Sequence, residues 1–304
     1  MGYGKDARFV KGLSRWSQGL YIFSPRPLTQ TETGFVALAF RPFPSFVPIP
    51  RSPGMGDETV IINSSIKNWS LVRRKTALRQ RAKILQAIRD CFVGQGFWEV
   101  ETPHRIPAPA PESYIDAVPS GSWFLHPSPE LCMKRMLAAG YEKIFQICRC
   151  WREGERGSQH IPEFTLLEWY HSGVDYSTLM EECAVLIQTV ATRVGLGERI
   201  IFCDQPIDLT TPWEKIPLRK AFLEYAKTPM EEALKDGSFD ELMVRDIEPR
   251  LGKKKPTFVF DYPAERGALA RLKIEDRTLA ERFELYMGGL ELANGFSELA
   301  DPEE

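Results

Sequence analysis

Residues 148–170 read CRCWREGERGSQHIPEFTLLEWY. The apolar run 144–151 that leads into this stretch predicts a strand, and the polar residues 153–162 predict a loop. The chain then returns through 164–170, a second strand candidate. Period two places four residues on one face of that strand: Phe164, Leu166, Glu168 and Tyr170. A carboxylate beside a phenol on one face indicates a cleft, although an edge strand with a solvent-facing Glu168 would give the same pattern.

The segments on either side of this hairpin alternate between helical and strand patterns. Helices are predicted over 71–93, 128–140 and 176–195, strands over 97–101, 257–262, 281–286 and 290–295, and short helices with loops over 200–256. The strands follow one another through loops and hairpins, without regular crossover helices. This order favours an α+β fold with an antiparallel sheet flanked by helices. The sequence contains neither G-x-x-x-x-G-K-[ST] nor G-x-G-x-x-G, so any use of ATP would not involve a P-loop.

Composition narrows the class of protein further. The 304 residues carry a formal net charge of -2, so a basic field of the kind that drives non-specific nucleic-acid binding is absent. The six cysteines include no C-x-x-C pair, which disfavours a zinc site and is typical of free thiols in a reducing cytoplasm. The chain shows no apolar run of about 18 residues and no signal-peptide pattern, so neither a membrane nor a secreted location is predicted.

Residues 1–68 differ from the rest because seven prolines interrupt residues 25–53. Proline breaks helices and central strands, so a poorly ordered N-terminal extension is predicted here. A small β-module remains an alternative, as does sequence upstream of a true start near Met55. Residues 69–304 are expected to form the main, catalytic domain.

Arg152 stands where the first predicted strand enters the loop. A guanidinium is always charged and presents a planar fork that suits phosphate. At a strand end it would need little reorganisation to stabilise a phosphate under nucleophilic attack. A surface ion pair with Glu153 or Glu155 is the simpler interpretation of a lone arginine, and only the surrounding motifs favour the phosphate.

These motifs resemble the class II aminoacyl-tRNA synthetases. Residues 148–170 resemble their motif 2, and HIPEFTLLEWY at 160–170 is similar to the lysyl-type enzymes and to their short bacterial paralogues, the elongation factor P (R)-β-lysine ligases. FWEVETP at 97–103 resembles motif 1, SPELCMKR at 128–135 resembles an amino-acid-binding segment, and GLELANGFSEL at 289–299 resembles a later block. The resemblance covers about 71–304 and implies the class II catalytic core.

The resemblance implies a role for each matching residue. The amino acid would contact Ser128, Glu130, Glu168, Tyr170, Asn294 and Glu298. Arg152 would be the catalytic residue, and ATP would contact Arg152, Glu153, Glu155, His160, Phe164, Glu291 and Leu292. Glu291 and Glu298 would hold Mg²⁺. The residue types agree, since a substrate with two amines needs several carboxylates and Mg²⁺ prefers oxygen ligands. A hairpin turn at Asn294 and a solvated helix start at Glu298 are the plain alternatives.

The implied function is the ATP-dependent activation of lysine or (R)-β-lysine as an aminoacyl-adenylate, with transfer to a lysine of elongation factor P. The resemblance also implies a cytoplasmic homodimer that pairs through motif 1. A lysyl-tRNA synthetase is the first alternative, but tRNA as a partner is disfavoured by the net charge and because only 68 proline-interrupted residues precede the domain. A non-catalytic paralogue is the second alternative.

Two departures from the family pattern matter. Ile161 stands before Pro162 where many relatives have asparagine, which removes one polar group near ATP. Motif 3, a strand and helix with a G-x-G-x-D-R-L pattern whose arginine would hold the γ-phosphate, is not found. The domain is therefore expected to be C-terminally truncated, and this chain is expected to be weakly active or inactive.

Overall fold

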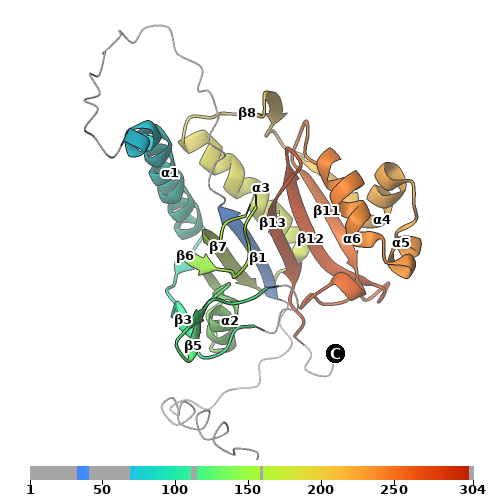
Figure 1. Cartoon of the computed structure of the whole chain (residues 1–304), viewed down its shortest axis with the longest axis horizontal. Coiled ribbons are helices and arrows are strands. Elements are labelled where there is room, and N and C mark those ends of the chain that lie inside the picture. The colour runs from blue at the N-terminus through green and yellow to red at the C-terminus, as the bar shows by residue number, and fades with distance from the viewer. Residues whose placement is uncertain (1–32, 41–68, 111–114, 158–159, 301–304) are drawn as a thin grey trace, which may run out of the picture. The chain divides into compact units, whose positions relative to one another are not determined.

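The computed structural model describes residues 33–40, 69–110, 115–157 and 160–300 (Figure 1). Its central element is an eight-stranded sheet with the strand order β10-β11-β12-β13-β1-β7-β6-β2. All neighbours in it are antiparallel except β2 with β6 and β10 with β11. The strands are β1 (Thr33–Phe40), β2 (Trp98–Glu99), β6 (Lys143–Trp151), β7 (Glu163–Ser172), β10 (Glu214–Pro217), β11 (Thr257–Pro263), β12 (Leu279–Met287) and β13 (Leu290–Ser297). The predicted α+β class with an antiparallel sheet and flanking helices is confirmed.

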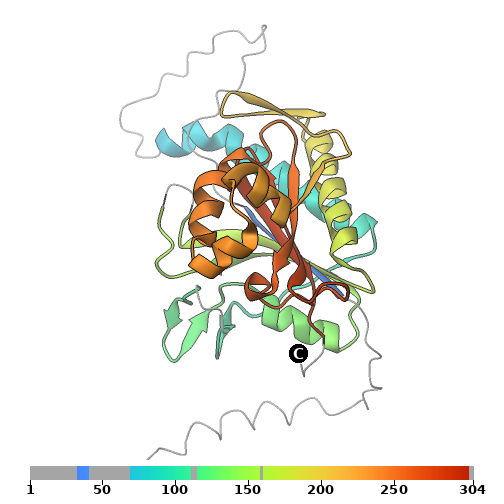
Figure 2. The same ribbon diagram turned by 90° about the vertical axis from the view of Figure 1, so that its right-hand side faces the viewer.

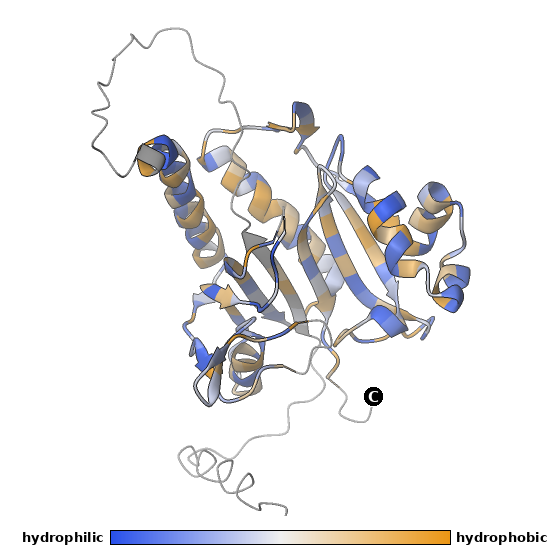
Figure 3. Ribbon diagram, viewed as in Figure 1, coloured by the Kyte–Doolittle hydropathy of each residue, from blue (hydrophilic) through white to orange (hydrophobic). Residues whose placement is uncertain are grey.

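One face of the sheet packs against two long helices, α1 (Trp69–Gly94) and α3 (Tyr176–Arg193). Asp175 caps α3 by accepting hydrogen bonds from the backbone N–H groups of Ser177 and Thr178, which would otherwise have no partner. Residues two apart on a strand point to the same face, and Figure 3 shows hydrophobic residues on the strands as well as on the helices that cover them. The apolar core on this face includes Ile88, Phe145, Trp169, Leu179 and Phe283.

The opposite face carries α2 (Glu130–Ala138) at one end and a group of short helices over β11 and β12 at the other (Figures 1 and 2). These are α4 (Leu218–Ala221), η2 (Phe222–Ala226), α5 (Met230–Asp236), α6 (Phe239–Leu242), η3 (Met243–Ile247), η4 (Glu248–Arg250) and η5 (Ala264–Arg266). Two small sheets complete the described part: β3 (Arg105–Ile106), β4 (Pro119–Ser120) and β5 (Trp123–Leu125), and the hairpin of β8 (Arg199–Phe202) with β9 (Gln205–Asp208). Between the two groups of helices, this face carries polar side chains.

Strand β1 corrects the prediction for the N-terminal residues. For Thr33–Phe40 the poorly ordered extension is wrong, because this segment is a central strand between β7 and β13. Val36 is fully buried in the core with α3, and a Cβ at Gly34 would lie 2.7 Å from a side-chain carbon of Leu179. Without β1, two inner strands would each expose an unpaired edge. The other residues of 1–68 lie outside the described part of the chain.

Replacing Val36 with aspartate tests whether β1 belongs to the core. A carboxylate there has no partner and is cut off from water, so Val36→Asp should lower the free energy of unfolding by at least about 3 kcal/mol. The control is Ile274→Asp, where the side chain is 82% exposed and the change should stay within about 0.5 kcal/mol. Denaturant titration measures both. Equal, small losses in the two variants would show that residues 33–40 do not form this strand.

Candidate active site

A row of residues crosses the polar face of the sheet at the level of Glu168. The strand register aligns Gln146 with Glu168, Glu168 with Ala37, Ala37 with Asn294, and Asn294 with Glu284. Directly paired residues project to the same face, so five strands present this row together. The sequence pattern predicted a cleft beside Glu168, and the neighbouring strands contribute further polar groups to the same surface.

Glu168 lies at the centre of a hydrogen-bonded group. Its carboxylate is fully buried, and it accepts hydrogen bonds from Ser128 Oγ at 2.7 Å and from Tyr170 Oη at 3.0 Å. Ser128 Oγ in turn accepts one from the backbone N–H of Glu130 at 3.0 Å, in the first turn of α2. The edge-strand alternative for Glu168 is excluded, because β1 and β6 flank β7 on both sides.

A lysine of the chain itself joins two more of the predicted residues. Lys134 Nζ lies 2.6 Å from Glu130 Oε1 and 2.8 Å from Glu298 Oε2. Glu298 is 8% exposed, so the alternative of a solvated helix start is excluded. We call Ser128, Glu130, Lys134, Glu168, Tyr170 and Glu298 the acidic cluster. Sequence analysis named five of these six residues and did not identify Lys134.

The acidic cluster contains more negative than positive charge, and its pKa values reflect this excess. Burial, and next the nearby Glu130 carboxylate, raise the pKa of Glu168 well above its usual range, although the bonds from Ser128 and Tyr170 oppose the shift. Burial likewise raises the pKa of Glu298 to about 7, against the stabilising effect of Lys134. Burial opposes the charge of Lys134, but Glu298 and Glu130 outweigh it and raise the pKa of that ammonium. The cluster is therefore suited to accepting further positive charge.

Arg152 lies at the end of β6, next to this cluster. Its Nε is 3.5 Å from the carbonyl oxygen of Pro127, the residue before Ser128. Its guanidinium lies 5.0 Å from the centroid of the Phe164 ring, and Nη1 is 3.4 Å from Glu155 Oε1. The ion pair with Glu155 that the sequence offered as an alternative therefore exists, but both side chains keep about a quarter of their surface exposed and can meet a ligand.

The other residues predicted to contact ATP are more scattered. Phe164 is buried against Cys148, Cys150 and Leu166, with the Arg152 guanidinium on its ring. Glu153 and His160 are exposed in the loop, where the carbonyl oxygen of His160 accepts a hydrogen bond from Gly157. Leu292 packs with the core next to α3, on the opposite face from Arg152. The Leu292 side chain therefore does not line the surface that carries Arg152.

Asn294 belongs to a second polar group on the β12–β13 pair. Its Oδ1 accepts a hydrogen bond from Arg282 Nε at 3.0 Å, and Arg282 Nη2 lies 2.6 Å from Glu284 Oε1. Asn294 lies inside β13 opposite Glu284, so a hairpin turn at Asn294 is excluded. Sequence analysis missed Arg282 and Glu284. Their alternation with Tyr286 along one strand face was the available signal.

The predicted magnesium pair is Glu291 with Glu298. Glu291 lies near the start of β13 and Glu298 just beyond its end. Glu291 lies opposite Tyr286 on β12. Burial opposes the charge of Arg282, but Glu284, and more weakly Glu291, raise the pKa of its guanidinium. The sharing of one ion by Glu291 and Glu298 stays a prediction.

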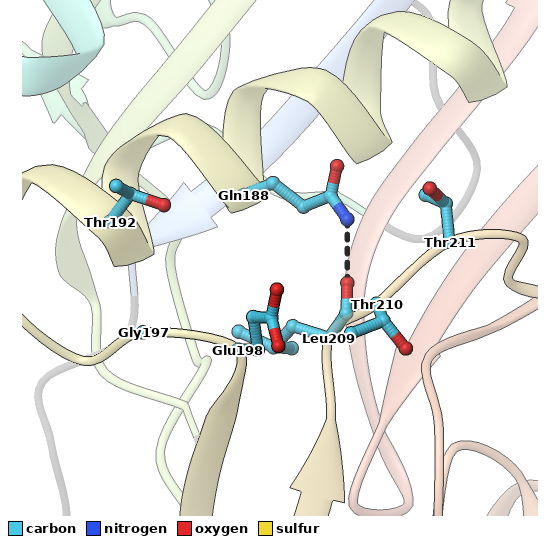
Figure 4. Close-up of a pocket in the computed structure, with 7 residues that line it drawn as sticks. All are labelled: Gln188, Thr192, Gly197, Glu198, Leu209, Thr210 and Thr211. Carbon is cyan, nitrogen blue, oxygen red and sulfur yellow. Dashed lines mark hydrogen bonds between the residues drawn. The ribbon is translucent and has the colours of Figure 1, made fainter.

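A pocket of about 330 Å³ lies elsewhere, between the end of α3 and the segment that follows β9 (Figure 4). Gln188 crosses it and donates a hydrogen bond to the carbonyl oxygen of Leu209 at 2.7 Å. It is lined by Gln188, Thr192, Gly197, Glu198, Leu209, Thr210 and Thr211, none of which sequence analysis predicted as a site residue.

Comparison with known proteins identifies relatives of this chain. Residues 59–304 match the family model "tRNA synthetases class II (D, K and N)". The elongation factor P–(R)-β-lysine ligase of Vibrio atlanticus (strain LGP32) is 36% identical over 252 residues, which cover 78% of each chain. The ligase of the same name from Enterobacter sp. (strain 638) is 38% identical over 259 residues, 79% of each chain. The lysine–tRNA ligase of Variovorax paradoxus (strain S110) is 31% identical, and the match covers 95% of this chain and 62% of that protein.

The raised pKa of Glu298 predicts a specific dependence of stability on pH. Between its ordinary value of 4.5 and about 7, the folded protein binds more protons at this group than the unfolded chain does, so Glu298 lowers stability as the pH rises through this window. Glu298→Gln cannot ionise. Its free energy of unfolding, relative to the unsubstituted chain, should therefore rise between pH 5 and pH 8, by about 3 kcal/mol at most.

The matched control is Glu265→Gln, which changes an exposed glutamate. Chemical denaturation of the three proteins at pH 5, 6, 7 and 8 gives the comparison. If the two variants followed the same trend with pH, Glu298 would not be a buried group with a raised pKa.

Proposed function

The chain belongs to the class II tRNA synthetases, and we propose that it activates lysine or (R)-β-lysine with ATP and transfers it to a lysine of elongation factor P. The relatives that bear the name of this ligase support the choice of acceptor. The family supports an ATP-dependent ligase, and the geometry of the acidic cluster supports a substrate with two amines.

The observation that carries the proposal is the charge of the acidic cluster. Glu130 and Glu298 face one ammonium, that of Lys134, and Glu168 lies near Glu130, so three carboxylates share a single positive charge. Lys134 itself demonstrates that Glu130 and Glu298 hold an ammonium at hydrogen-bond distance. Two further ammonium groups, as on lysine or β-lysine, would balance the cluster and favour ionised Glu168 and Glu298.

Arg152 is the group placed to act on the nucleotide. In the first step an oxygen of the substrate carboxylate bonds to the α-phosphorus of ATP, and the bond from that phosphorus to the bridging oxygen breaks to release pyrophosphate. The guanidinium at the strand end would hold the α-phosphate oxygens and stabilise the charge that develops on them. In the second step an amine of elongation factor P attacks the activated carbonyl carbon, and AMP leaves with the electron pair.

A magnesium ion would be held by the predicted pair, Glu291 and Glu298. Glu284 and Glu291 offer a second pair of carboxylates for the same ion. These carboxylates come from adjacent strands, and both act electrostatically on Arg282 and Tyr286, so they share one neighbourhood. Bound there, Mg²⁺ would neutralise phosphate charge during the transfer. Arg282 holds Glu284 in place at 2.6 Å, and Asn294 fixes Arg282 from the other side.

Lysine–tRNA ligation is the alternative that a specific observation favours, because the match to the Variovorax enzyme covers nearly the whole chain. The formal net charge of -2 provides no field to attract tRNA. A non-catalytic paralogue is the third possibility.

A label-transfer experiment separates the three functions. The protein is incubated with ATP, Mg²⁺ and labelled lysine or (R)-β-lysine, together with either elongation factor P or tRNA. The proposal expects label on elongation factor P. Label on tRNA alone would replace the proposal with the synthetase function, and label on neither, with no pyrophosphate exchange, would indicate a non-catalytic protein.

Arg152→Lys should reduce adenylate formation about 100-fold or more, because lysine keeps the charge but loses the planar fork. The control is Arg149→Lys, three residues earlier in the chain, on β6. The Arg149 side chain is 53% exposed, and its Nη1 lies 3.8 Å from Glu163 Oε1. ATP–pyrophosphate exchange measures the rate of each variant. Each rate is compared as a ratio to that of the unsubstituted chain, so a slow enzyme still gives a result. A similar loss in the two variants would remove Arg152 from its proposed role.

We also propose a cytoplasmic homodimer that pairs through α1 and β2. Leu71, Val72, Leu78 and Trp98 on these two elements are each more than half exposed, and an exposed apolar surface of this kind is typical of a protein interface. The six cysteines are free thiols, as a reducing compartment requires. In the described part of the chain, no helix combines the length and apolar character needed to cross a lipid bilayer.

The double variant Leu71→Glu, Leu78→Glu should dissociate this dimer, because it places like charges on both sides of a two-fold contact. Sedimentation equilibrium should give twice the 34.7 kDa chain mass for the unsubstituted protein and the single-chain mass for the variant. The control is Ile201→Glu, Leu223→Glu, at two apolar residues with comparable exposure elsewhere. A monomeric unsubstituted protein, or dissociation by the control pair, would contradict the assigned interface.

A further inference from the structure

Three potential metal ligands meet beneath the loop that leads to Ser128. His126, Cys148 and Cys150 are all buried, and one ligand atom from each lies within 4.8 Å of the others. His126 follows β5, and the two cysteines belong to β6. The proposed chemistry of lysine, ATP and Mg²⁺ uses none of them.

The tautomer of His126 leaves one ring nitrogen available. Its Nε2 lies 2.7 Å from the carbonyl oxygen of Arg149, and a carbonyl only accepts hydrogen bonds, so Nε2 carries the proton and donates. Nδ1 then holds a lone pair. This atom is buried and has no hydrogen-bond partner within the described residues, although an unpartnered buried polar atom is costly. A metal-binding histidine usually donates a hydrogen bond from its other ring nitrogen to a carbonyl or carboxylate oxygen.

The two sulfur atoms have the separation that a tetrahedral ion requires. Cys148 Sγ and Cys150 Sγ are 3.8 Å apart. With zinc–sulfur bonds of about 2.3 Å and a tetrahedral angle, two thiolates on one zinc ion lie about 3.8 Å apart. The corresponding nitrogen–sulfur distance is about 3.6 Å, so a shift of His126 by roughly 1 Å would complete the set.

The spacing of the cysteines explains why sequence analysis disfavoured zinc. The familiar C-x-x-C pair belongs to turns, and this chain has C-x-C instead. On a strand, residues two apart point to the same face, so Cys148 and Cys150 lie side by side.

We propose that His126, Cys148 and Cys150 bind one thiophilic divalent cation of the Zn²⁺ type, with a fourth coordination position open to a small ligand. Two thiolates and a divalent cation are neutral together, which a buried position requires. The ion would tie the loop before α2 to β6. Because Ser128 lies two residues after His126 and Arg152 two residues after Cys150, it would fix the separation between the amino-acid and phosphate contacts of the proposed active site.

The backbone around the cluster supports this positioning role. The N–H of His126 donates to the carbonyl oxygen of His104 at 2.9 Å, and the N–H of Trp151 donates to the carbonyl oxygen of His126 at 3.1 Å. The rings of His104 and Trp151 pack against the His126 ring. The loop therefore holds His126 next to the strand before any ion binds, so binding needs little reorganisation.

The test uses the full-length reduced protein with metal alone, without ATP or lysine. Zinc content after gel filtration, measured by plasma mass spectrometry, should be one ion per chain. Cobalt(II) substitution should give the near-ultraviolet charge-transfer band of thiolate ligation. Cys148→Ser and Cys150→Ser should each lose the band and weaken zinc binding at least tenfold. Cys203→Ser, at the exposed cysteine, should retain both.

The spectrum of the unsubstituted chain decides the question even if a serine variant fails to fold. A chain that gives no thiolate band with cobalt would overturn the proposal, and so would equal zinc binding by Cys150→Ser and Cys203→Ser. A disulfide between Cys148 and Cys150 in the freshly purified protein, with no zinc retained, would also overturn it and identify a redox pair. The readouts do not involve ligation, so they are independent of the proposed enzymatic function.

Discussion

The structure depends on burying the carboxylate of Glu168 in the middle of an inner strand. A buried carboxylate needs hydrogen-bond donors, and Ser128 and Tyr170 provide them, while Lys134 pairs with the neighbouring carboxylates of Glu130 and Glu298. The opposite face of the same strand carries Leu167 and Trp169 into the main core. The two-residue period of β7 thus separates a packed face, which stabilises the sheet, from a polar face that carries the acidic cluster.

The strand alternation also explains how much the sequence predicted. The long helices α1 and α3, the strands β6, β7, β11, β12 and β13, the antiparallel sheet, and the meeting of Ser128, Glu130, Glu168, Tyr170 and Glu298 followed from periodicity and from the motif resemblance. These features are local or lie within contiguous motifs. Arg152 was likewise predicted beside this group, and the contact with Pro127 places it there. Strands β8, β9 and β10 lie where short helices and loops were predicted, and there the prediction was wrong.

The features that the sequence did not predict all depend on contacts between distant segments. Prolines on both sides of Thr33–Phe40 concealed a strand whose partners are more than a hundred residues away. Nothing in the local sequence distinguishes Lys134 from other helical lysines, because its partner Glu298 lies far away in the chain. Glu284 was missed because the register of β12 and β13 is not visible in a motif. His126 and Cys148 are 22 residues apart, and only the sheet brings them together.

The central claim is that the acidic cluster and Arg152 form one binding surface for two joined ligands. Calorimetry with a non-hydrolysable lysyl-adenylate analogue tests this claim most directly, with lysine alone and AMP alone as the two parts. One surface predicts that the analogue binds at least a hundredfold more tightly than either part, since the second contact becomes intramolecular. If the analogue bound no more tightly than the stronger binder of lysine and AMP, the acidic cluster and Arg152 would not form one binding surface.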